Sequence, residues 1–322
     1  MGDNIYTKVV SSGSYLPRRV VSNNELSSCV PTSDEWIVSR TGICERRIAG
    51  DDETTCMMAV SAARQAVDRA SCDPSEIDCI IVATTTPDNV IPAVACSVQH
   101  RLGCSNAAAF DLQSACSGFV HALSVADAFI RSQQFRRILV IGAEVFSRIV
   151  NWEDRSTCVL FGDGAGAMLL ESSSVPGILA SHISCDGQYA DILHVPCHLD
   201  RGSITGDPYV QMEGSSVFKL AVHFFESSIN AVLGKAGVDI STVDWVVPHQ
   251  ANIRIIDSLF SRLGIDREKA IVTLPFHGNT SAASVPLAFD WGYIKGFIKS
   301  GDRCLLTAFG SGLSWGSILI DV

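Results

Sequence analysis

The stretch CDPSEIDCIIVA, residues 72–83, returns about half the chain later as VDISTVDWVVPH, residues 238–249. In each copy an aspartate precedes a hydrophobic strand. Further matches keep the same order. A helix-like segment precedes each stretch, 54–71 in the first half and 214–237 in the second. Beyond the stretches, HRLG ending at Gly103 is matched by SRLG ending at Gly264, and RILVIGAE from Arg137 is matched by RCLLTAFG from Arg303. Chance similarity between α/β segments is the alternative, but matches in one order favour an internal duplication.

The duplicated pattern predicts an α/β fold made of two similar halves. Apolar strands alternate with helical segments in each half, and residues 80–83 and 138–142 are apolar enough to be fully buried strands. We expect each half to be a mostly parallel sheet flanked by helices. The Ser- and Pro-containing stretch 171–176 is the predicted boundary, so that residues 1–172 form one half and residues 173–322 the other.

Composition places the chain among large packed globular proteins. Of its 322 residues, 47% are hydrophobic and 18% are charged, a balance that excludes a disordered chain. The net charge of −10 disfavours nucleic-acid binding, which needs clustered Lys and Arg. The beginning MGDNIYTKVV has no apolar signal core, and no apolar run approaches membrane-spanning length. We therefore expect a cytoplasmic protein that binds neither membrane nor nucleic acid.

The 12 cysteines are scattered singly, and no CxxC pair occurs among them. This pattern indicates no disulfide framework. In a reducing cytosol most of these thiols are expected to fill space as small buried hydrophobes. One cysteine stands apart because of its position.

Cys116 lies between a predicted strand, 109–112, and a helix, 116–133, that is apolar on almost every face. Such a helix is predicted to lie buried between layers. A cysteine at a helix start lies beside unpaired N–H groups and the positive end of the helix dipole, which lower the pKa of a thiol and favour a nucleophilic thiolate. Small neighbours such as Ser114 and Gly118 leave room for a substrate. A structural thiol is the alternative.

Two polar residues in the second half are candidate partners. His249 follows the predicted strand 245–247, at the carboxyl end where open α/β sheets bind ligands. Its counterpart in the first half is Ala83, which indicates that the second copy acquired a function; a core or capping histidine is the alternative. Asn279 lies in FHGNTSAASVP before a small-residue helix, where an asparagine is usually a cap. His277 is two residues away and competes for the role.

Two glycine-rich stretches lie where a ligand loop is conceivable. GDGAGAM from Gly162 has the spacing GxGxG and is followed by strand-like sequence, so we predict a tight turn near the active site and no NAD binding. GSGLSWGS from Gly310 lacks the GxSxG of a nucleophile elbow. Its glycines are expected to expose backbone N–H groups to an oxyanion.

Along essentially its whole length the chain resembles β-ketoacyl-acyl-carrier-protein synthase III, a family of condensing enzymes in the thiolase superfamily. The motifs that carry the resemblance occur in the family's order: GSYLPRRVVSNNEL, TSDEWIVSRTGI, FDLQSACSGF, LFGDGAGA, VPHQANIRII, HGNTSAASVP and AFGSGLSWGS. The resemblance implies a thiolase-like five-layered αβαβα fold from two duplicated halves and a homodimer. It implies neither a metal nor a cofactor, since acyl-CoA is a substrate.

The resemblance also implies a two-step reaction. Cys116 accepts an acyl group from acyl-CoA, with acetyl-CoA the expected primer, and malonyl-acyl-carrier protein then enters. Decarboxylation gives an enolate whose oxygen is held by the side chains of His249 and Asn279. Backbone N–H groups of Cys116 and Ser311 hold the tetrahedral intermediate, and Ser311 stands where a Gly is common, which crowds this oxyanion hole.

Further residues are assigned to substrates by the resemblance. They are Trp36, Arg40 and Arg155 for CoA, Lys219, Arg254 and Arg262 for docking of the acidic carrier protein, and Ile91 at the acyl pocket. Two other functions stay open: a relative that acylates an oxygen or nitrogen acceptor or condenses a specialised-metabolite precursor, and a non-catalytic subunit of the same fold. The complete set of Cys116, His249 and Asn279 favours carbon–carbon bond formation.

Overall fold

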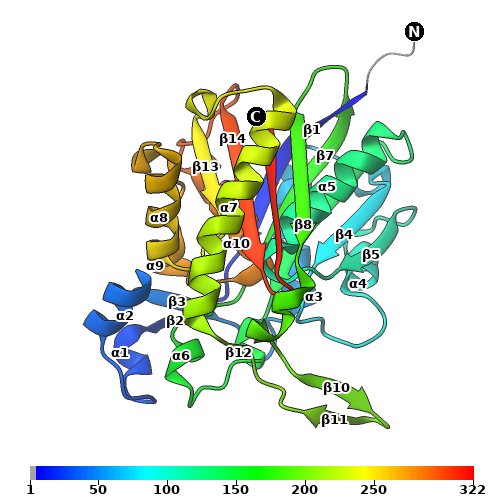
Figure 1. Ribbon diagram of the computed structural model, residues 1–322. Coiled ribbons are helices and arrows are strands. Elements are labelled where there is room, and N and C mark those ends of the chain that lie inside the picture. The colour runs from blue at the N-terminus through cyan, green and yellow to red at the C-terminus, as the bar shows by residue number, and fades with distance from the viewer. Residues whose placement is uncertain (1–4) are drawn as a thin grey trace.

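Two β-sheets form the centre of the structure, a computed structural model that describes residues 5–322. The first sheet consists of β1 (Tyr6–Tyr15), β7 (Gly164–Ser173), β6 (Arg137–Glu144), β4 (Cys79–Ala83) and β5 (Ala108–Leu112), in that spatial order. The second consists of β13 (Trp245–Pro248), β14 (Arg303–Gly310), β15 (Ser314–Asp321) and β8 (Ile178–Cys185), also in that order. Figure 1 shows the two sheets side by side.

The two sheets repeat one plan. The order β1-β7-β6-β4 in the first corresponds to β8-β15-β14-β13 in the second. The quoted stretches also repeat in detail: the Asp78 carboxylate accepts from the backbone N–H of Arg137 at 2.8 Å, and Asp244 accepts from that of Arg303 at the same distance. Each aspartate therefore ties the start of one buried strand to the start of its neighbour. The division of the chain between residues 172 and 173 stays a prediction.

The expectation of mostly parallel sheets is wrong. β4 is parallel to β5 and β6, and β13 is parallel to β14, but the other four pairings are antiparallel. The reason is the last strand of each half. β15 follows β14 after a short turn and so runs back beside it, and β7 also runs back beside β6, after the longer connection 145–163.

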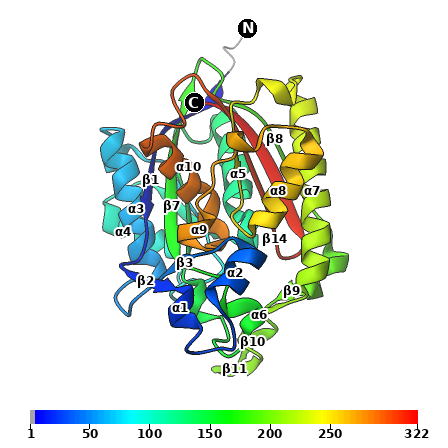
Figure 2. The same ribbon diagram turned by 90° about the vertical axis from the view of Figure 1, so that its left-hand side faces the viewer.

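Helices separate and cover the sheets, so that five layers result (Figure 2). The outer face of the first sheet is covered by α3 (Thr55–Arg69) and α4 (Val94–Leu102). The space between the sheets holds α5 (Gly118–Arg131) and α10 (Ser284–Ile294). The outer face of the second sheet is covered by α7 (Gly214–Ala236) and α8 (Ile253–Leu263). The prediction that the apolar helix after Cys116 is buried between layers is confirmed. Phe119, Val120 and Leu123 on α5 are at most 1% exposed.

Smaller elements gather at one end of the layers, the lower end in both views (Figures 1 and 2). They are α1 (Asn23–Leu26), α2 (Asp34–Thr41), α6 (Arg155–Cys158), β2 (Arg19–Ser22), β3 (Glu45–Ile48), β9 (Leu193–His194), β10 (Cys197–Asp200), β11 (Ser203–Gly206) and β12 (Gln211–Met212). A further short helix, α9 (Leu274–His277), precedes Asn279. The carboxyl ends of the parallel strands point toward this end, which is where ligands bind in such sheets.

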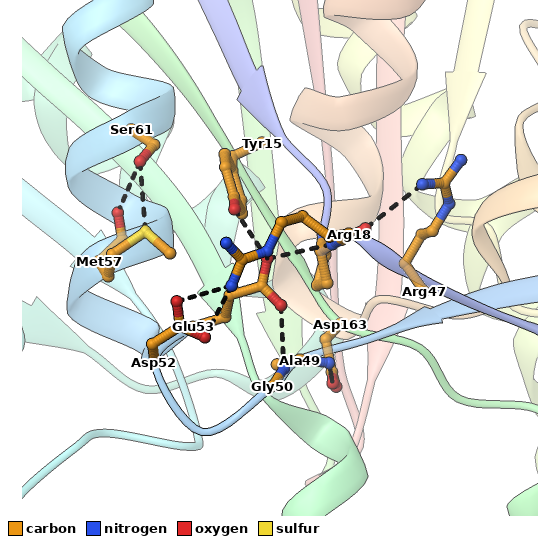
Figure 3. Close-up of polar contacts among 11 residues, drawn as sticks. Tyr15, Arg18, Arg47, Ala49, Gly50, Asp52, Glu53, Met57, Ser61 and Asp163 are labelled. Carbon is orange, nitrogen blue, oxygen red and sulfur yellow. Dashed lines mark hydrogen bonds and ion pairs between the residues drawn. The ribbon is translucent and has the colours of Figure 1, made fainter.

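Buried carboxylates anchor the loops at this end. Glu53 is 1% exposed and accepts from the Tyr15 hydroxyl at 2.8 Å, the Arg18 N–H at 3.0 Å and the Gly50 N–H at 2.9 Å, as Figure 3 shows. These bonds join the end of β1 to the loop after β3. Because two of the three donors are backbone N–H groups, the loop is held in one position relative to the sheet.

The GDGAGAM stretch is anchored in the same way. Asp163 is fully buried and accepts from the backbone N–H of Ala49 at 2.8 Å (Figure 3) and from the N–H of Ser147 at 2.9 Å. The stretch continues directly into β7, so the prediction that a strand follows it, and not a dinucleotide-binding helix, is confirmed.

The expectation that most cysteines are buried is wrong, since six of the twelve are buried and two are half-buried. The other four, Cys29, Cys44, Cys96 and Cys185, are exposed, and none of the twelve forms a disulfide. Within the described residues no helix has both the length and the apolar character that crossing a membrane requires.

Candidate active site

A cavity of about 950 Å³ opens at the carboxyl ends of the parallel strands. It is lined by residues that directly follow β4, β5, β6, β13 and β14. Of the residues singled out in the sequence, the cavity brings together Trp36, Arg40, Cys116, Lys219, His249, Arg254, Asn279 and Ser311. Ile91, Arg155 and Arg262 are not among the lining residues.

Cys116 lies at a sharp turn before the central helix. The turn is a short 3-10 segment, Ala115–Ser117, that begins with Ala115 at φ 45° and leads into α5. The Cys116 side chain is 5% exposed, and its Sγ lies 3.5 Å from the Oγ of Ser281. Its position at a helix start is therefore as predicted.

The expected low pKa of Cys116 is wrong. The pKa of the thiol is raised to about 12, chiefly by burial and to a smaller extent by the nearby carboxylate of Glu144. Desolvation of a thiolate in a closed site outweighs the favourable helix start. Cys116 is therefore a thiol at neutral pH, and its proton must leave as it attacks.

His249 is held as a neutral imidazole. It is 3% exposed, and burial lowers its pKa to about 3. Its Nδ1 lies 2.6 Å from the Oγ of Ser284. When this hydroxyl donates to Nδ1, the ring proton sits on Nε2, so that Nε2–H is the donor of His249.

Asn279 is oriented by the chain that follows it. Its Oδ1 accepts from the backbone N–H of Ser281 at 2.9 Å, so its Nδ2 amide is the end that remains to donate. His277 does not compete for this role, because it does not line the cavity. Two neutral donors, His249 Nε2–H and Asn279 Nδ2–H, are thus available to a developing oxyanion.

The end of β14 comes unusually close to Cys116. A Cβ on Gly310 would lie 2.7 Å from the Cys116 backbone nitrogen, so only glycine allows this approach. The next residue, Ser311, lines the cavity. Its hydroxyl donates to the carbonyl oxygen of Leu193. The hydrogen bond of this side chain is therefore made within the protein and needs no group of the substrate.

Trp36 and Arg155 form a stack beside the cavity. The Arg155 guanidinium carbon lies 4.6 Å from the centroid of the Trp36 ring, and its Nη1 donates to the carbonyl of Pro31 at 2.9 Å. A planar base between the two groups needs about 7 Å, twice the usual contact distance of ~3.5 Å. Binding between them therefore requires Arg155 to move.

The three basic residues proposed for docking differ in their surroundings. Lys219 and Arg254 are exposed and line the cavity, and the Arg254 guanidinium lies 5.6 Å from the ring centroid of Phe218. Arg262 lies at the far end of α8 and forms a 3.0 Å ion pair with Glu226. Its charge is thus already partly neutralised.

Ile91 does not reach the cavity in this chain. Its side chain is 84% exposed, and its neighbour Val90 is 74% exposed. Its assignment to an acyl pocket therefore stays a prediction. In the part of the chain that the structure describes, no group of three or more His, Cys, Asp or Glu could hold a metal ion.

The sequence analysis did not identify three functional candidates, Glu144, Ser281 and Ser284. For Glu144, the duplication contains a signal that could have found it. In the match of RILVIGAE with RCLLTAFG, Glu144 stands opposite Gly310, just as His249 stands opposite Ala83. A carboxylate at the end of a buried strand, without a counterpart in the other half, indicates a functional residue, as the missing counterpart does for His249.

Two sequence profiles match the chain. The profile described as 3-oxoacyl-[acyl-carrier-protein (ACP)] synthase III matches residues 110–187. The profile for the C-terminal part of the same enzyme matches residues 233–322. The first contains Cys116, and the second contains His249 and Asn279.

Similar proteins cover nearly the whole chain. A β-ketoacyl-[acyl-carrier-protein] synthase III of Bordetella petrii is 51% identical over 319 residues, 98% of this chain and 97% of that protein. The structure of 3-oxoacyl-[acyl-carrier-protein] synthase III from Aquifex aeolicus has a TM-score of 0.93 at 46% identity and covers 98% of this chain and 100% of that one. The priming β-ketosynthase of the R1128 polyketide biosynthetic pathway has a TM-score of 0.94 at 39% identity, over 99% of this chain and 97% of that one.

Proposed function

Because the chain belongs to the β-ketoacyl-[acyl-carrier-protein] synthase III family of condensing acyltransferases, we propose that it starts fatty-acid chains from acetyl-CoA or another short acyl-CoA. The acyl group is joined to malonyl-acyl-carrier protein, and CO₂ is released. The observation that carries this proposal is the convergence of Cys116, His249 and Asn279 on one cavity, although they come from distant parts of the chain.

The first step transfers the acyl group to Cys116. Its Sγ attacks the thioester carbonyl, and the negative charge moves to the carbonyl oxygen. Backbone N–H groups of Cys116 and Ser311 are the proposed donors to this oxygen, and the close approach at Gly310 supports their pairing. Collapse of the intermediate breaks the bond to the CoA sulfur.

The second step forms the carbon–carbon bond. Loss of CO₂ from the malonyl thioester leaves an electron pair that is delocalised as an enolate. His249 Nε2–H and Asn279 Nδ2–H donate to the enolate oxygen. The carbon then attacks the acyl carbon on Cys116, the bond from that carbon to Sγ breaks, and the Cys116 thiolate that leaves takes up a proton from solvent. Because both donors are neutral, they stabilise the anion without adding an unpaired charge to a dry site.

CoA is proposed to enter past Trp36, Arg40 and Arg155. The adenine stacks on the Trp36 ring after Arg155 moves aside, and the two arginines pair with phosphates. The exposed pair Val90 and Ile91 supports a homodimer, in which Ile91 of one copy borders the acyl group bound by the other.

A primer screen tests the proposed function. The enzyme is incubated with malonyl-acyl-carrier protein and acyl-CoA primers of increasing length and branching, and CO₂ and 3-oxoacyl product are measured together. We expect equal amounts of both, with the highest kcat/KM for acetyl-CoA or another short primer. Transfer of acyl groups to an oxygen or nitrogen acceptor without CO₂, or no turnover with any primer, would contradict the proposal.

Docking of the acidic carrier protein is expected to depend on Arg254. The chain carries a net charge of −10, so attraction must be local. Three exposed bases line the cavity, Arg40, Lys219 and Arg254, and of these Arg40 is assigned to CoA, which leaves Lys219 and Arg254 for the carrier protein. Arg254→Glu should raise the KM for malonyl-acyl-carrier protein about tenfold and flatten its salt dependence, while acylation by acyl-CoA stays nearly unchanged.

A matched control changes the same charge elsewhere. Arg136 is exposed just before the amino end of β6, at the opposite edge of the sheet from the cavity. Arg136→Glu should leave the KM for the carrier protein as it is. If Arg254→Glu and Lys219→Glu behave like this control at low ionic strength, the carrier protein docks on another surface.

A further inference from the structure

The buried carboxylate of Glu144 takes part in none of the steps above. Glu144 ends β6 and is fully buried. Its donors are the hydroxyls of Thr84, Thr85, Thr86 and Ser281 and the backbone N–H of Thr85. Within residues 5–322 no Lys, Arg or His forms an ion pair with it. The carboxylate is therefore held by neutral groups alone.

One of these donors connects Glu144 to the nucleophile. The Cys116 Sγ–H donates to the Oγ of Ser281 at 3.5 Å, and the Ser281 hydroxyl donates to Glu144 Oε1 at 3.1 Å. A single hydroxyl thus links the thiol to the carboxylate, and both bonds point the same way. This is the arrangement along which a proton passes from sulfur to carboxylate.

The other hydroxyls are oriented toward the carboxylate by the backbone. The Val145 N–H donates to Thr86 Oγ1 at 2.9 Å, and the Thr86 N–H donates to Thr84 Oγ1 at 3.1 Å. Each hydroxyl keeps its own hydrogen for Glu144. These donors favour the ionised form, whereas burial raises the pKa of Glu144. Such a group can both accept a proton and release it.

The cavity contains no better acceptor for the Cys116 proton. Among the described residues, those that line it include no Asp or Glu. Burial lowers the pKa of His249 to about 3, so that imidazole is a weak base. His194 also lines the cavity, but no hydrogen bond joins it to Cys116 within residues 5–322.

We propose that Glu144, acting through Ser281, takes up the Cys116 proton during acylation and returns it to the departing CoA thiolate. As Sγ forms its bond to the acyl carbon, the Sγ proton moves to Ser281 Oγ and the Ser281 hydroxyl proton moves to Glu144 Oε1. When the intermediate collapses and the bond to the CoA sulfur breaks, Glu144 Oε1 returns its proton to Ser281 Oγ, and the Ser281 hydroxyl gives its proton to the departing CoA sulfur. Glu144 is again a carboxylate, and no net proton is consumed.

Charge supports this path over loss of the proton to solvent. A thiolate formed by loss to solvent would lie one hydroxyl away from the Glu144 carboxylate, and two anions would share one buried site. The charge of Glu144 already raises the pKa of Cys116. Transfer within the pair keeps its total charge at −1 throughout, so no second anion is created in the dry site.

The test measures alkylation of Cys116 by iodoacetamide as a function of pH. While the pair shares one proton, its thiolate fraction is constant, so the rate in the wild-type enzyme should change less than about twofold between pH 7 and 9. In Glu144→Gln and in Ser281→Ala the rate should instead rise about tenfold per pH unit, as for an isolated thiol below its pKa. Because other cysteines are exposed, the Cys116 peptide is quantified by mass spectrometry.

The variants separate proton transfer from structural support. Ser281→Ala leaves Glu144 its other donors and keeps the backbone N–H that orients Asn279. Alanine also fits the left-handed backbone there, since Ser281 has φ 49° and the corresponding Ala115 has φ 45°. Ser117→Ala is the matched control, because it removes another buried hydroxyl beside Cys116 that bonds to Ser314 and not to Glu144. This control should keep the flat profile.

A second readout uses the proposed substrates, on which the acyl-transfer step of this inference rests. In Glu144→Gln the formation of acyl-Cys116 from acetyl-CoA at pH 7 should be about 100-fold slower, while melting temperature stays near that of the wild type. A flat alkylation profile in Glu144→Gln or Ser281→Ala overturns the inference. A flat wild-type profile that is lost in both variants, with no acylation by any acyl-CoA, supports the proton path and contradicts the proposed function instead.

Discussion

Cys116→Ala should abolish both the acyl adduct and condensation with every primer. The reason is that Cys116 is the one thiol that combines access to the cavity with backbone donors for a tetrahedral intermediate. Mass spectrometry of the intact protein after incubation with acetyl-CoA measures the adduct, and product formation with malonyl-acyl-carrier protein measures condensation. CO₂ release from the malonyl thioester should persist, since His249 and Asn279 are unchanged.

Cys104→Ala is the matched control for this variant. Cys104 is fully buried, and burial raises its pKa to about 11, but it lies after α4 and does not line the cavity. Adduct formation and turnover should both be retained. An acyl adduct that survives in Cys116→Ala, or one that maps to another peptide, would show that the nucleophile is a different residue.

His249→Ala and Asn279→Ala should each slow CO₂ release and condensation about 100- to 1,000-fold, which corresponds to roughly 2.7–4 kcal/mol for one oxyanion donor. Acylation of Cys116 by acyl-CoA should change far less, because the donors act on the later enolate. Radiolabelled malonyl thioester measures decarboxylation, and the acyl adduct is measured in parallel. An equal loss of both half-reactions would contradict this division of roles.

Ser284→Ala should slow CO₂ release and condensation less than His249→Ala does, since the Ser284 hydroxyl only orients His249.

The pH dependence of CO₂ release provides an independent check on His249. The pKa of His249 is lowered to about 3, so its neutral form persists as the pH falls through the usual 6.5. CO₂ release should therefore show no loss with an apparent pKa near 6.5, whereas an unshifted imidazole would lose about 90% of its neutral form by pH 5.5.

Much of the site could be predicted from the sequence because its information is local or repeated. The repeated strands at 79–83 and 245–248 placed His249 at a strand end, and the small residues around Cys116 marked a turn before a helix. Side chains at the carboxyl ends of parallel strands meet at one edge of a sheet. The cavity therefore contains Cys116, His249 and Asn279 together, as expected.

The errors arose where distant residues decide the outcome. The position of Cys116 before a helix is visible in the sequence, but the raised pKa of its thiol depends on burial and on a carboxylate from another strand. The assignment of Ile91 to an acyl pocket came from the family resemblance and stays a prediction, since its side chain is exposed in this chain. The mixed sheets follow from where β7 and β15 turn back, which strand-like sequence does not reveal.

The sequence by itself determined the duplicated α/β plan, because strand ends, helix starts and repeats are visible in short stretches. It also singled out Cys116, His249 and Asn279 as candidate site residues, through their positions in those stretches and through the family resemblance of the surrounding motifs. Only the tertiary structure decided the protonation of those groups and the link between Cys116 and Glu144. Ser281 and Glu144 are 137 positions apart in the chain, and their hydrogen bond exists only because the two halves pack against each other. Desolvation and hydrogen bonding across that packing determine where the proton resides.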